Sequence, residues 1–411
     1  MRLALIAPPN DYLAHARSWP PLGLGHLSAY VKREMPDVSV DMIILKAGEK
    51  APGGYDVYGF SASTHDYRAA RDLAWDIKQR EPKAVCILGG GHATVMAGRT
   101  SLVFDKVVMG EGEVSLVRCL RDIQRRAVRR FYTSDPIADL DSLPFPDRHF
   151  GDEFKYATVM ASRGCPYHCS YCATQTIWPG PTRWRSPGNA VAEIADLKAH
   201  GVDYVSMIDD SLTVRRDWLT AFCEAIKPVG MKWRALSRVD RIDPEILARM
   251  RDAGCDMIKL GAESFDPAVL KAMGKGTTPE QGMKAAEDVY DAGLTLWLLL
   301  MISTPGETLA TVPLNETALE RLCGKVSVSS LHTFMPMPAT PVYHKPKDYG
   351  IKIIDKDVSH YNRLWWGSEG KQNPPWSPIE IDGLTRRQQM ENIARMRDCV
   401  TRLGSPSKGL A

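Results

Sequence analysis

Short apolar runs alternate with amphipathic segments along the first third of the chain. Apolar runs that predict strands cover residues 3–8, 38–45, 57–62, 84–89 and 106–109. Segments with helical periodicity cover residues 25–33, 67–80 and 114–126. Strands that alternate with helices are typical of parallel sheets with crossover helices. The N-terminal third therefore predicts an α/β fold with a doubly wound, Rossmann-like parallel sheet.

The alternation resumes near residue 156 with longer helices. The apolar runs of this part predict strands at 157–162, 204–208, 233–237, 257–261, 294–302 and 326–333. The helical segments lie at 189–200, 217–227, 244–252, 279–292 and 308–322. Asp243 before Pro244 and Thr278 before Pro279 are typical helix starts. Six β-α units of this kind predict a partial (β/α)6 barrel, a fold whose chemistry lies at the carboxyl ends of the strands.

The same pattern divides the chain into parts. We expect a first domain over residues 1–135, a linker rich in proline and aspartate over 136–155, and the barrel over 156–343. Beyond residue 343 the alternation stops, and a long helix is predicted at 384–402. Residues 344–411 are therefore predicted to form a C-terminal helical cap, which could either cover the site or only pack against the barrel.

Composition narrows the class of protein only a little. Of 411 residues, 44% are hydrophobic and 25% are charged, as in ordinary globular proteins. The net charge of +3 gives no footprint for nucleic-acid binding and does not exclude it. The longest apolar run, at 294–302, is far short of a membrane helix, and no signal peptide opens the chain. With nine cysteines, an odd number, these features indicate a cytoplasmic protein without a membrane partner.

Three cysteines stand close together at the start of the predicted barrel. Cys165, Cys169 and Cys172 have the spacing C-x3-C-x2-C, directly after the first predicted strand. Three thiolates can bind three irons of a cubane [4Fe-4S] cluster, and the fourth iron is then left open. A structural zinc ion would require a fourth ligand, for which His168 is the candidate inside the motif.

A helix would also place these cysteines on one face, because their offsets of four and seven residues fit helical periodicity. Pro166 argues against a helix, since it disfavours the helical conformation of Cys165. Cluster ligation is thus the preferred interpretation, with structural cysteines or zinc as the alternatives.

The motif after Ser162-Arg163-Gly164, with Tyr171 before the last cysteine, resembles the signature of radical S-adenosylmethionine (SAM) enzymes. The resemblance implies that SAM chelates the open iron through its amino and carboxylate groups. It also implies that an electron from the cluster cleaves SAM to methionine and a 5′-deoxyadenosyl radical, so that a flavodoxin- or ferredoxin-like reductant is needed. Tyr171 occupies the position that lies against the adenine in the family.

Residues at the ends of four further predicted strands match, in order, elements that the family uses around SAM. They are Asp209, Asp210, Ser237, Arg238, Gly261, Glu263, Ser264, Pro305 and Gly306. The resemblance implies that the Asp209-Asp210 pair accepts hydrogen bonds from the SAM ammonium and that Arg238 pairs with the SAM carboxylate. It places Glu263 near the ribose. Each of these residues alone is equally compatible with an ordinary polar loop.

The N-terminal third resembles the cobalamin-binding domain that precedes many radical SAM cores. The resemblance rests on residues 56–62, 88–94 and 109–113, and it implies that Ser61, Gly89, Gly90 and Gly91 line the cofactor. The Asp-x-His-x-x-Gly motif of histidine-ligated cobalamin is absent from the loop at residues 9–15. Relatives without this motif either bind cobalamin without histidine or have lost it. The alternative is that the glycines only form tight turns.

Together these features predict an enzyme that abstracts hydrogen from an unactivated carbon of a small molecule or a modified nucleobase. The resemblance implies cobalamin-assisted methyl transfer where cobalamin is bound. Without cobalamin it implies a radical isomerase, for example one acting on a modified thymine in phage DNA. The alternative class is a non-enzymatic binding module stabilised by an iron–sulfur cluster or zinc. No catalytic side chain is assigned from the sequence.

Overall fold

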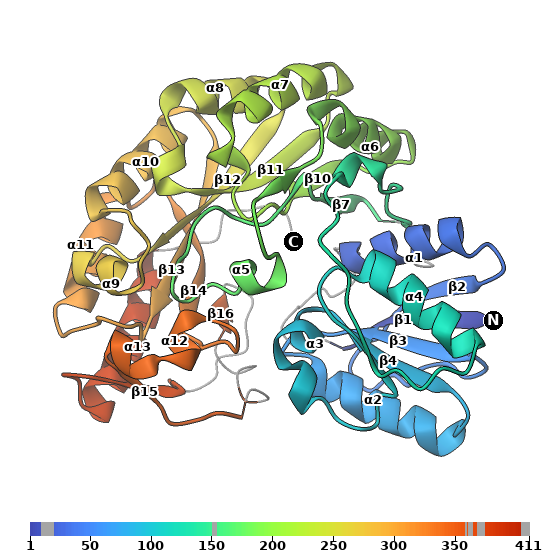
Figure 1. Cartoon of the computed structure of the whole chain (residues 1–411). Helices are drawn as coiled ribbons and strands as arrows, with labels where there is room; N and C mark the ends of the chain where they lie inside the picture. The colour runs from blue at the N-terminus through green and yellow to red at the C-terminus, as the bar shows by residue number, and fades with distance from the viewer. Residues whose placement is uncertain (10–19, 150–153, 358–359, 361–364, 368–374, 404–411) are drawn as a thin grey trace. The chain divides into compact units, whose positions relative to one another are not determined.

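The protein is described from a computed structural model of the whole chain, shown in Figure 1. The described residues are 1–9, 20–149, 154–357, 360, 365–367 and 375–403. The chain forms two compact units. The first comprises Met1–Thr158 with Thr174–Arg185, and the second comprises Val159–Ala173 with Ser186–Ala411. The cysteine motif thus belongs to the second unit, and the residues that directly follow it belong to the first.

The first unit contains a six-stranded sheet in the order β2-β1-β3-β4-β5-β6, with every pair of neighbours parallel. The doubly wound parallel sheet that the sequence predicts is confirmed. Its strands are β1 (Arg2–Ala7), β2 (Ser39–Ile44), β3 (Val57–Ser61), β4 (Val85–Gly89), β5 (Lys106–Val108) and β6 (Phe131–Tyr132). Its helices are α1 (Leu22–Glu34), α2 (Tyr67–Arg80), α3 (Gly91–Met96), α4 (Gly112–Gln124) and α5 (Thr174–Ile177), and β9 (Arg183–Trp184) lies in the same part of the chain.

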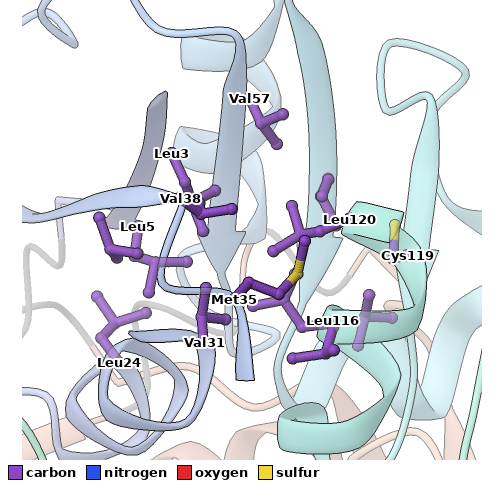
Figure 2. Close-up of a cluster of buried hydrophobic side chains, with 14 of the residues drawn as sticks. Leu3, Leu5, Leu24, Val31, Met35, Val38, Val57, Leu116, Cys119 and Leu120 are labelled. Atoms are coloured by element: carbon purple, nitrogen blue, oxygen red, sulfur yellow. The ribbon is translucent and has the colours of Figure 1, made fainter. Parts of the chain in front are cut away.

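Side chains of β1, which lies between β2 and β3, are buried on both faces of this sheet. Leu3 and Leu5 point into a cluster with α1 and α4, which Figure 2 shows. Ala4 and Ile6, the alternate residues, belong to a second cluster with α2 on the opposite face. The continuous apolar run of β1 is therefore explained by a strand covered by helices on both sides.

The segment that the sequence predicts as a linker packs against α1. The Asp147 N–H donates to the Gly25 carbonyl over 3.0 Å, and the Ser28 hydroxyl donates to Asp147 Oδ2 over 2.8 Å. A Cβ on Gly25 would lie 2.5 Å from the Asp147 carbonyl oxygen, so glycine is required for this close approach. Residues up to Thr158 accordingly belong to the first unit.

The second unit is built on a seven-stranded sheet in the order β16-β14-β13-β12-β11-β10-β7. Its parallel strands are β10 (Tyr204–Met207), β11 (Lys232–Arg238), β12 (Cys255–Glu263), β13 (Thr295–Ile302) and β14 (Ser327–Thr333). The edge strand β7 (Tyr156–Val159) begins in the first unit and ends in the second, and the short β8 (Ser162–Arg163) precedes the cysteines. The helices between them are α6 (Pro187–Ala199), α7 (Arg216–Ile226), α8 (Pro244–Asp252), α9 (Pro267–Ala272), α10 (Pro279–Asp291) and α11 (Thr311–Arg321). Most of these helices lie along the outer face of the curved sheet (Figure 1). The partial barrel that the sequence predicts is confirmed.

Proline-marked caps set the start of several barrel helices. Asp243 accepts a hydrogen bond from the Ile246 N–H before α8, and Thr278 forms a capping box with Gln281 before α10. Ser186 caps α6 in the same way, and the helix begins at Pro187, two residues earlier than predicted. None of the helices within the described ranges is both long and apolar enough to cross a membrane.

The C-terminal segment is a mixed structure, whereas the sequence predicts a helical cap. Two short strands, β15 (Ile351–Ile353) and β17 (Ile379–Ile381), pair antiparallel, and β16 (Trp365–Gly367) pairs antiparallel with β14. The helices are α12 (Pro341–His344) and α13 (Arg386–Leu403). The predicted long helix at 384–402 is thus present, but the strands are too short to give a periodic signal in the sequence.

Glu307 ties α13 to the turn after β13. Its side chain is buried and accepts hydrogen bonds from Asn392 Nδ2 over 2.9 Å and from the Thr304 N–H over 3.1 Å. Burial raises the pKa of Glu307 to about 7 despite these hydrogen bonds. Between the two pKa values, Glu307 is protonated in the folded chain and ionised in the unfolded chain. The stability of the fold should therefore fall as the pH rises toward 7.

We expect Glu307→Gln to remove this pH dependence. Thermal unfolding of the full chain should show a higher melting temperature for the variant at pH 8. The free energy of unfolding should be higher by roughly 3 kcal/mol at most. At pH 5 the variant and the wild type should unfold alike. The exposed Glu320→Gln on the same side of the barrel is the control and should behave as the wild type. Equal melting curves for wild type and Glu307→Gln at pH 8 would contradict the prediction.

Candidate functional site

The three cysteines lie in an irregular loop, residues 164–173, between β8 and α5. Gly164 at its start has φ +100°, a conformation that favours glycine. Cys169 is buried, and Cys165 and Cys172 are partly exposed. The helical alternative for these cysteines is wrong, because this loop contains no helical turn of the required length.

Asp209 anchors the start of the cysteine loop. This side chain follows β10 and is 1% exposed. Its Oδ1 accepts hydrogen bonds from the Ala161 N–H over 3.0 Å and from the Ser162 hydroxyl over 2.5 Å. Burial raises the pKa of Asp209 to about 6. The carboxylate thus joins the end of β10 to the residues that lead into the motif.

The far end of the loop is anchored by Ser170. Its N–H and its hydroxyl both donate to the Met273 carbonyl, over 2.9 and 3.0 Å. Its own carbonyl accepts from the Val342 N–H over 3.2 Å. Tyr171 packs against an apolar cluster that is formed by Phe334 and Val342 together with the isoleucines of β15 and β17. The C-terminal segment therefore helps to fix the position of the loop.

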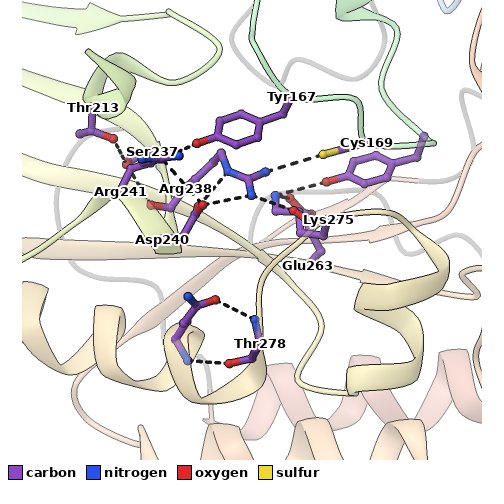
Figure 3. Close-up of polar contacts among 12 residues, drawn as sticks. Tyr167, Cys169, Thr213, Ser237, Arg238, Asp240, Arg241, Glu263, Lys275 and Thr278 are labelled. Carbon is purple, nitrogen blue, oxygen red and sulfur yellow. Dashed lines mark hydrogen bonds and ion pairs between the residues drawn. The ribbon is translucent and has the colours of Figure 1, made fainter. Parts of the chain in front are cut away.

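Arg238 lies beside the buried cysteine, as Figure 3 shows. Its Nη1 lies 3.7 Å from Cys169 Sγ, and its guanidinium carbon lies 3.7 Å from the centre of the Tyr167 ring. Asp240 accepts from Arg238 Nε over 2.8 Å, and the Lys275 carbonyl accepts from Nη2 over 2.7 Å. A cation is thus held rigidly next to a sulfur that would carry negative charge as a thiolate.

A buried ion pair supports Tyr171. Lys275 Nζ donates to Glu263 Oε1 over 2.8 Å and to the Tyr171 hydroxyl over 3.2 Å. Glu263 has φ +66°, which is unusual for a residue other than glycine and lies at a β-bulge. A Cβ on Gly261 would lie 2.7 Å from Glu263 Oε1, so glycine leaves room for the pair. Burial and the charge of Glu263 raise the pKa of Tyr171 well above its usual value.

The thiols are close enough together to affect one another. Burial raises the pKa of Cys165, and the charges of Asp210, Cys172 and Cys169 raise it further. Three thiolates in this space repel one another, and iron ions would relieve the repulsion. Among the described residues, no three His, Cys, Asp or Glu side chains are arranged as a single metal ion requires. A cubane has a different requirement, since each cysteine binds a different iron. The donor set thus fits an iron–sulfur cluster.

The residues predicted to hold SAM fall into two groups in the structure. The first group belongs to the cysteine loop or interacts with it through the contacts and charges described above, and it consists of Tyr171, Asp210, Arg238 and Glu263. Ser237 is buried and hydrogen-bonded to the Thr213 hydroxyl. Contact of these residues with SAM stays a prediction, and the first group is the better placed for it.

Other predicted residues pack around α9 instead. Ser264 accepts a hydrogen bond from the Asp266 N–H over 3.1 Å and is 2% exposed. A Cβ on Gly306, which follows Pro305, would lie 2.7 Å from the Ala272 Cβ. Ser264, Pro305 and Gly306 thus lie where α9 packs against the end of β12 and the turn between β13 and α11.

Three residues that the sequence analysis did not single out complete the site. Tyr167 lies under the Arg238 guanidinium, and its hydroxyl accepts a hydrogen bond from Arg241. Lys275 contacts both Tyr171 and Glu263. Tyr167 could have been noticed from its place inside the motif. Lys275 and Arg241 carry no local signal, because their partners are far away in the sequence.

In the first unit, the loops after β3, β4 and β5 are joined at one edge of the sheet. The Ala62 N–H donates to the Gly89 carbonyl, and the His92 N–H donates to the Ala62 carbonyl, each over 3.0 Å. The Thr94 hydroxyl accepts from the Gly110 N–H over 3.0 Å. Sheets with this strand order bind ligands at the carboxyl ends of β1 and β3, where the order reverses. The predicted residues Ser61, Gly89, Gly90 and Gly91 lie at this edge, whereas most of the loop after β1 lies outside the described residues.

Gly90 has φ +86°, and a Cβ there would lie 2.7 Å from the Ala62 carbonyl oxygen. Asp66 lies at the end of the loop after β3, directly before α2, and its buried Oδ1 has no hydrogen-bond partner among the described residues. Burial raises the pKa of Asp66 to about 6. An acceptor without a partner next to a glycine edge fits a ligand with many N–H donors, such as the amide groups of cobalamin. His92 stacks on Tyr67 at 3.8 Å between ring centres and is 2% exposed, so it is packed inside the unit.

Two family profiles match the chain. The radical SAM superfamily profile matches residues 159–313, and the B12 binding domain profile matches residues 15–120. The first match covers the cysteine loop and most of the barrel strands. The second covers most of the six-stranded sheet.

Curated relatives are similar over most of their length. An uncharacterized methyltransferase of Pyrococcus horikoshii is 26% identical over 75% of this chain and 75% of its own. The anaerobic magnesium-protoporphyrin IX monomethyl ester cyclase of Rubrivivax gelatinosus is 27% identical over 84% of this chain and 69% of its own. The bacteriochlorophyllide d C-8(2)-methyltransferase of Chlorobaculum tepidum is 23% identical over 76% of this chain and 72% of its own.

Solved structures share the fold. The radical SAM methyltransferase TsrM from Kitasatospora setae, with tryptophan and a SAM analogue bound, gives a TM-score of 0.71 at 15% identity and covers 97% of this chain and 89% of its own. The cobalamin-dependent radical SAM enzyme OxsB gives a TM-score of 0.67 at 17% identity and covers 99% of this chain and 63% of its own. At these identities the likeness shows that both units have the fold of cobalamin-dependent radical SAM proteins.

Proposed function

We propose that this chain, which is a radical SAM enzyme with an N-terminal B12-binding domain, transfers a methyl group to an unactivated carbon of a small molecule. The observation that supports the proposal most is the presence of both domains on one chain, together with a fold that is similar to that of the methyltransferase TsrM over 97% of this chain. In this reaction the carbon loses hydrogen to form 5′-deoxyadenosine, and the methyl group takes the place of that hydrogen. A non-enzymatic binding module is no longer a candidate, because the chain belongs to a class of enzymes.

The bound cofactors supply the chemistry: the cluster and SAM give a carbon radical, and cobalamin gives the methyl group. The protein positions them. We expect Cys165, Cys169 and Cys172 to hold the cluster, and Arg238 to stabilise negative charge on Cys169 through its 3.7 Å contact. The Lys275–Glu263 pair fixes Tyr171 at the edge of this site.

Exclusion of competing molecules is the second task of the protein. The apolar cluster behind Tyr171 is made by Phe334, Val342 and the isoleucines of the C-terminal strands. A carbon radical would be lost if it took hydrogen from a weak C–H or S–H bond of another molecule, so a closely packed wall next to the site keeps competing donors away. We infer that the C-terminal segment serves this purpose.

A second candidate is hydrogen abstraction without methyl transfer. It is favoured by the similarity to the cyclase of Rubrivivax gelatinosus, which covers 84% of this chain and whose name describes no methyl transfer. The isomerase alternative belongs to the same class of reactions.

The products of SAM separate the two candidates. The chain would be purified without oxygen, supplied with iron, sulfide and cobalamin, and mixed with SAM and a flavodoxin-type reductant. Methyl transfer predicts S-adenosylhomocysteine in addition to 5′-deoxyadenosine, with the former dependent on cobalamin. The second candidate predicts 5′-deoxyadenosine alone. Absence of 5′-deoxyadenosine under every condition would refute both.

Gly90→Ala tests the cobalamin part of the proposal. The added Cβ would strain a backbone at φ +86° and clash with the Ala62 backbone at 2.7 Å. We expect a cost of about 1–3 kcal/mol and a displaced loop, and hence loss of the cobalamin absorption after gel filtration. The cluster absorption should remain.

Gly98→Ala is the matched control, since a Cβ there has nothing within 4 Å. It should keep bound cobalamin at the wild-type level. Full cobalamin binding by Gly90→Ala would show that the glycine edge is not part of the binding site.

A further inference from the structure

The face of the second sheet that points away from the helices carries two cations, the buried Arg234 and the half-buried Lys259. On β13 the side chains of Leu296, Leu298 and Leu300 are buried beneath the helices, while Trp297 between them is partly exposed on the opposite face. Lys259 of β12 lies directly beside Trp297, with Nζ 4.8 Å from the ring centre. The inner face of the sheet at this level is therefore cationic and aromatic.

Arg234 of β11 lies on the same face. Its guanidinium carbon is 5.3 Å from the centre of the Trp297 ring, and its Nε donates to the Ser206 hydroxyl over 3.0 Å. The preceding residue, Trp233, packs edge-on against Phe222 of α7, on the helix side of the sheet. Alternation along β11 thus directs Arg234 toward the inner face.

The charge of Lys259 is not balanced by the protein. Among the described residues it has no hydrogen-bond acceptor and no carboxylate partner, and its one polar contact is with the Trp297 ring. Burial lowers the pKa of Lys259 to about 7, and the nearby charge of Arg234 lowers it further. The negative charge of Asp256 favours the charged form of Arg234. Asp256 also accepts a hydrogen bond from the Tyr204 hydroxyl over 2.6 Å. Asp256 thus offsets the charge of Arg234, whereas Lys259 has no carboxylate partner among the described residues, and a charge that is partly removed from water without a partner is costly.

Lys259 lies two residues before the level of Arg238 in the sheet, on the side away from the carboxyl ends of the strands. It pairs with Leu236 in the sheet, and two residues further along, Gly261 pairs with Arg238, the residue that contacts Cys169. Two residues of a strand cover about 7 Å, and residues i and i+2 face the same side. A molecule whose one end lies against Lys259 would therefore extend toward the cysteine loop.

We propose that Lys259, supported by Arg234 and Trp297, binds an anionic group of the substrate, a carboxylate or a phosphate. The excess positive charge then has a partner, and the anionic group sets which carbon of the substrate faces the radical. The Trp297 ring offers an apolar wall for the part of the substrate next to this group. The inference rests on the proposed function, since it names the class of substrate for the same site.

The first test uses the wild-type enzyme with its cluster and measures the labelling of Lys259 by acetic anhydride near pH 7, read by peptide mass spectrometry. Inorganic phosphate and acetate serve as probes, against sodium chloride at equal ionic strength. We expect at least one probe to reduce labelling of Lys259 several-fold and to leave the exposed Lys232 unchanged. Protection by phosphate alone indicates a phosphate group, and protection by acetate also indicates a carboxylate. No labelling without a probe, or labelling that neither probe changes, would overturn the proposal.

The second test measures binding of inorganic phosphate or acetate by calorimetry in charge variants. We expect Lys259→Met to weaken binding by at least about tenfold, and Lys259→Arg to restore most of it. Lys232→Met, on the neighbouring strand, is the matched control and should bind as the wild type. Equal binding by Lys259→Met and wild type would overturn the proposal.

Formation of 5′-deoxyadenosine from SAM is measured in the same samples and reports on the proposed function alone. If the enzyme cleaves SAM but anion binding does not depend on Lys259, the proposed function stands and the inference about Lys259 is refuted. Failure to cleave SAM would instead refute the function, while the anion measurements would still decide whether Lys259 binds.

Discussion

Replacing Cys169 with alanine should abolish the iron–sulfur cluster and all cleavage of SAM. Cys169 is the buried cysteine of the three in the loop, and its Sγ lies 3.7 Å from Arg238 Nη1. Without it, two thiolates remain for a cluster that needs three protein ligands. Loss of a residue that only hydrogen-bonds to a metal ligand lowers activity by up to about 100-fold. Because Cys169→Ala removes a ligand itself, we expect 5′-deoxyadenosine formation to fall by more than this. Iron content and the visible absorption of the reconstituted protein should fall with it.

Cys323→Ala is the matched control. Cys323 is an exposed cysteine of the same unit, located before β14, and its removal should leave iron content and SAM cleavage unchanged. If Cys169→Ala kept a full cluster, another residue would have to occupy that corner. The interpretation of the motif as a three-cysteine site would then be wrong.

The sequence predicts the two sheets well because their strands are buried on one or both faces. The apolar run at 3–8 becomes β1, whose alternate residues fill two separate cores. Asp243 and Thr278 cap helices as their position before proline predicts. The same signal at Asp266 before Pro267 could have predicted α9, which the sequence analysis did not include. Local chemistry thus decides most of the elements.

The connections within the site are harder to predict, because they join residues that are distant in the chain. Ser170 bonds to Met273, 103 residues away, and Lys275 bonds to Tyr171, 104 residues away. No periodicity marks Lys275, and the short strands β15 and β17 carry too few residues for an alternation to be visible. The motif therefore predicts what the loop binds, whereas the fold determines what holds the loop.

Asp209 and Arg238 illustrate this difference. The resemblance implies contacts of both with SAM, and such contacts stay predictions. The structure gives Asp209 the task of anchoring Ala161 and Ser162. It places the Arg238 guanidinium against a cysteine sulfur, Tyr167 and Asp240. Both side chains therefore act on the cysteine loop itself.

Arg238→Gln should lower the reduction potential of the cluster. A reduced cluster carries one more negative charge than an oxidised one, and hydrogen bonds to its sulfurs stabilise the reduced form. The guanidinium next to Cys169 Sγ supplies both a positive charge and such a bond. A hydrogen bond to a charged group contributes about 1.5–3 kcal/mol, so its loss corresponds to a fall of roughly 60–130 mV for one electron. The potential is measured by redox titration of the electron paramagnetic resonance signal, without SAM.

Arg241→Gln is the control that matches Arg238→Gln in the charge removed and that shares two of its neighbours, although Arg241 is exposed. Arg241 also contacts Tyr167 and forms an ion pair with Asp240, but no contact with a cysteine is found for it among the described residues. Its removal should therefore shift the potential much less. Arg238→Lys keeps the charge and loses the fixed geometry, so its potential should lie between those of wild type and Arg238→Gln.

The same titration separates two roles of Arg238. If its task is only to bind the SAM carboxylate, Arg238→Gln will weaken SAM binding and leave the potential of the SAM-free cluster unchanged. If it acts on Cys169, the potential will fall before any SAM is added. Because the guanidinium is already bonded to Asp240 and to the Lys275 carbonyl, the structure favours the second outcome. A cluster that is harder to reduce would then limit the rate at which SAM is cleaved, even where SAM binding is unchanged.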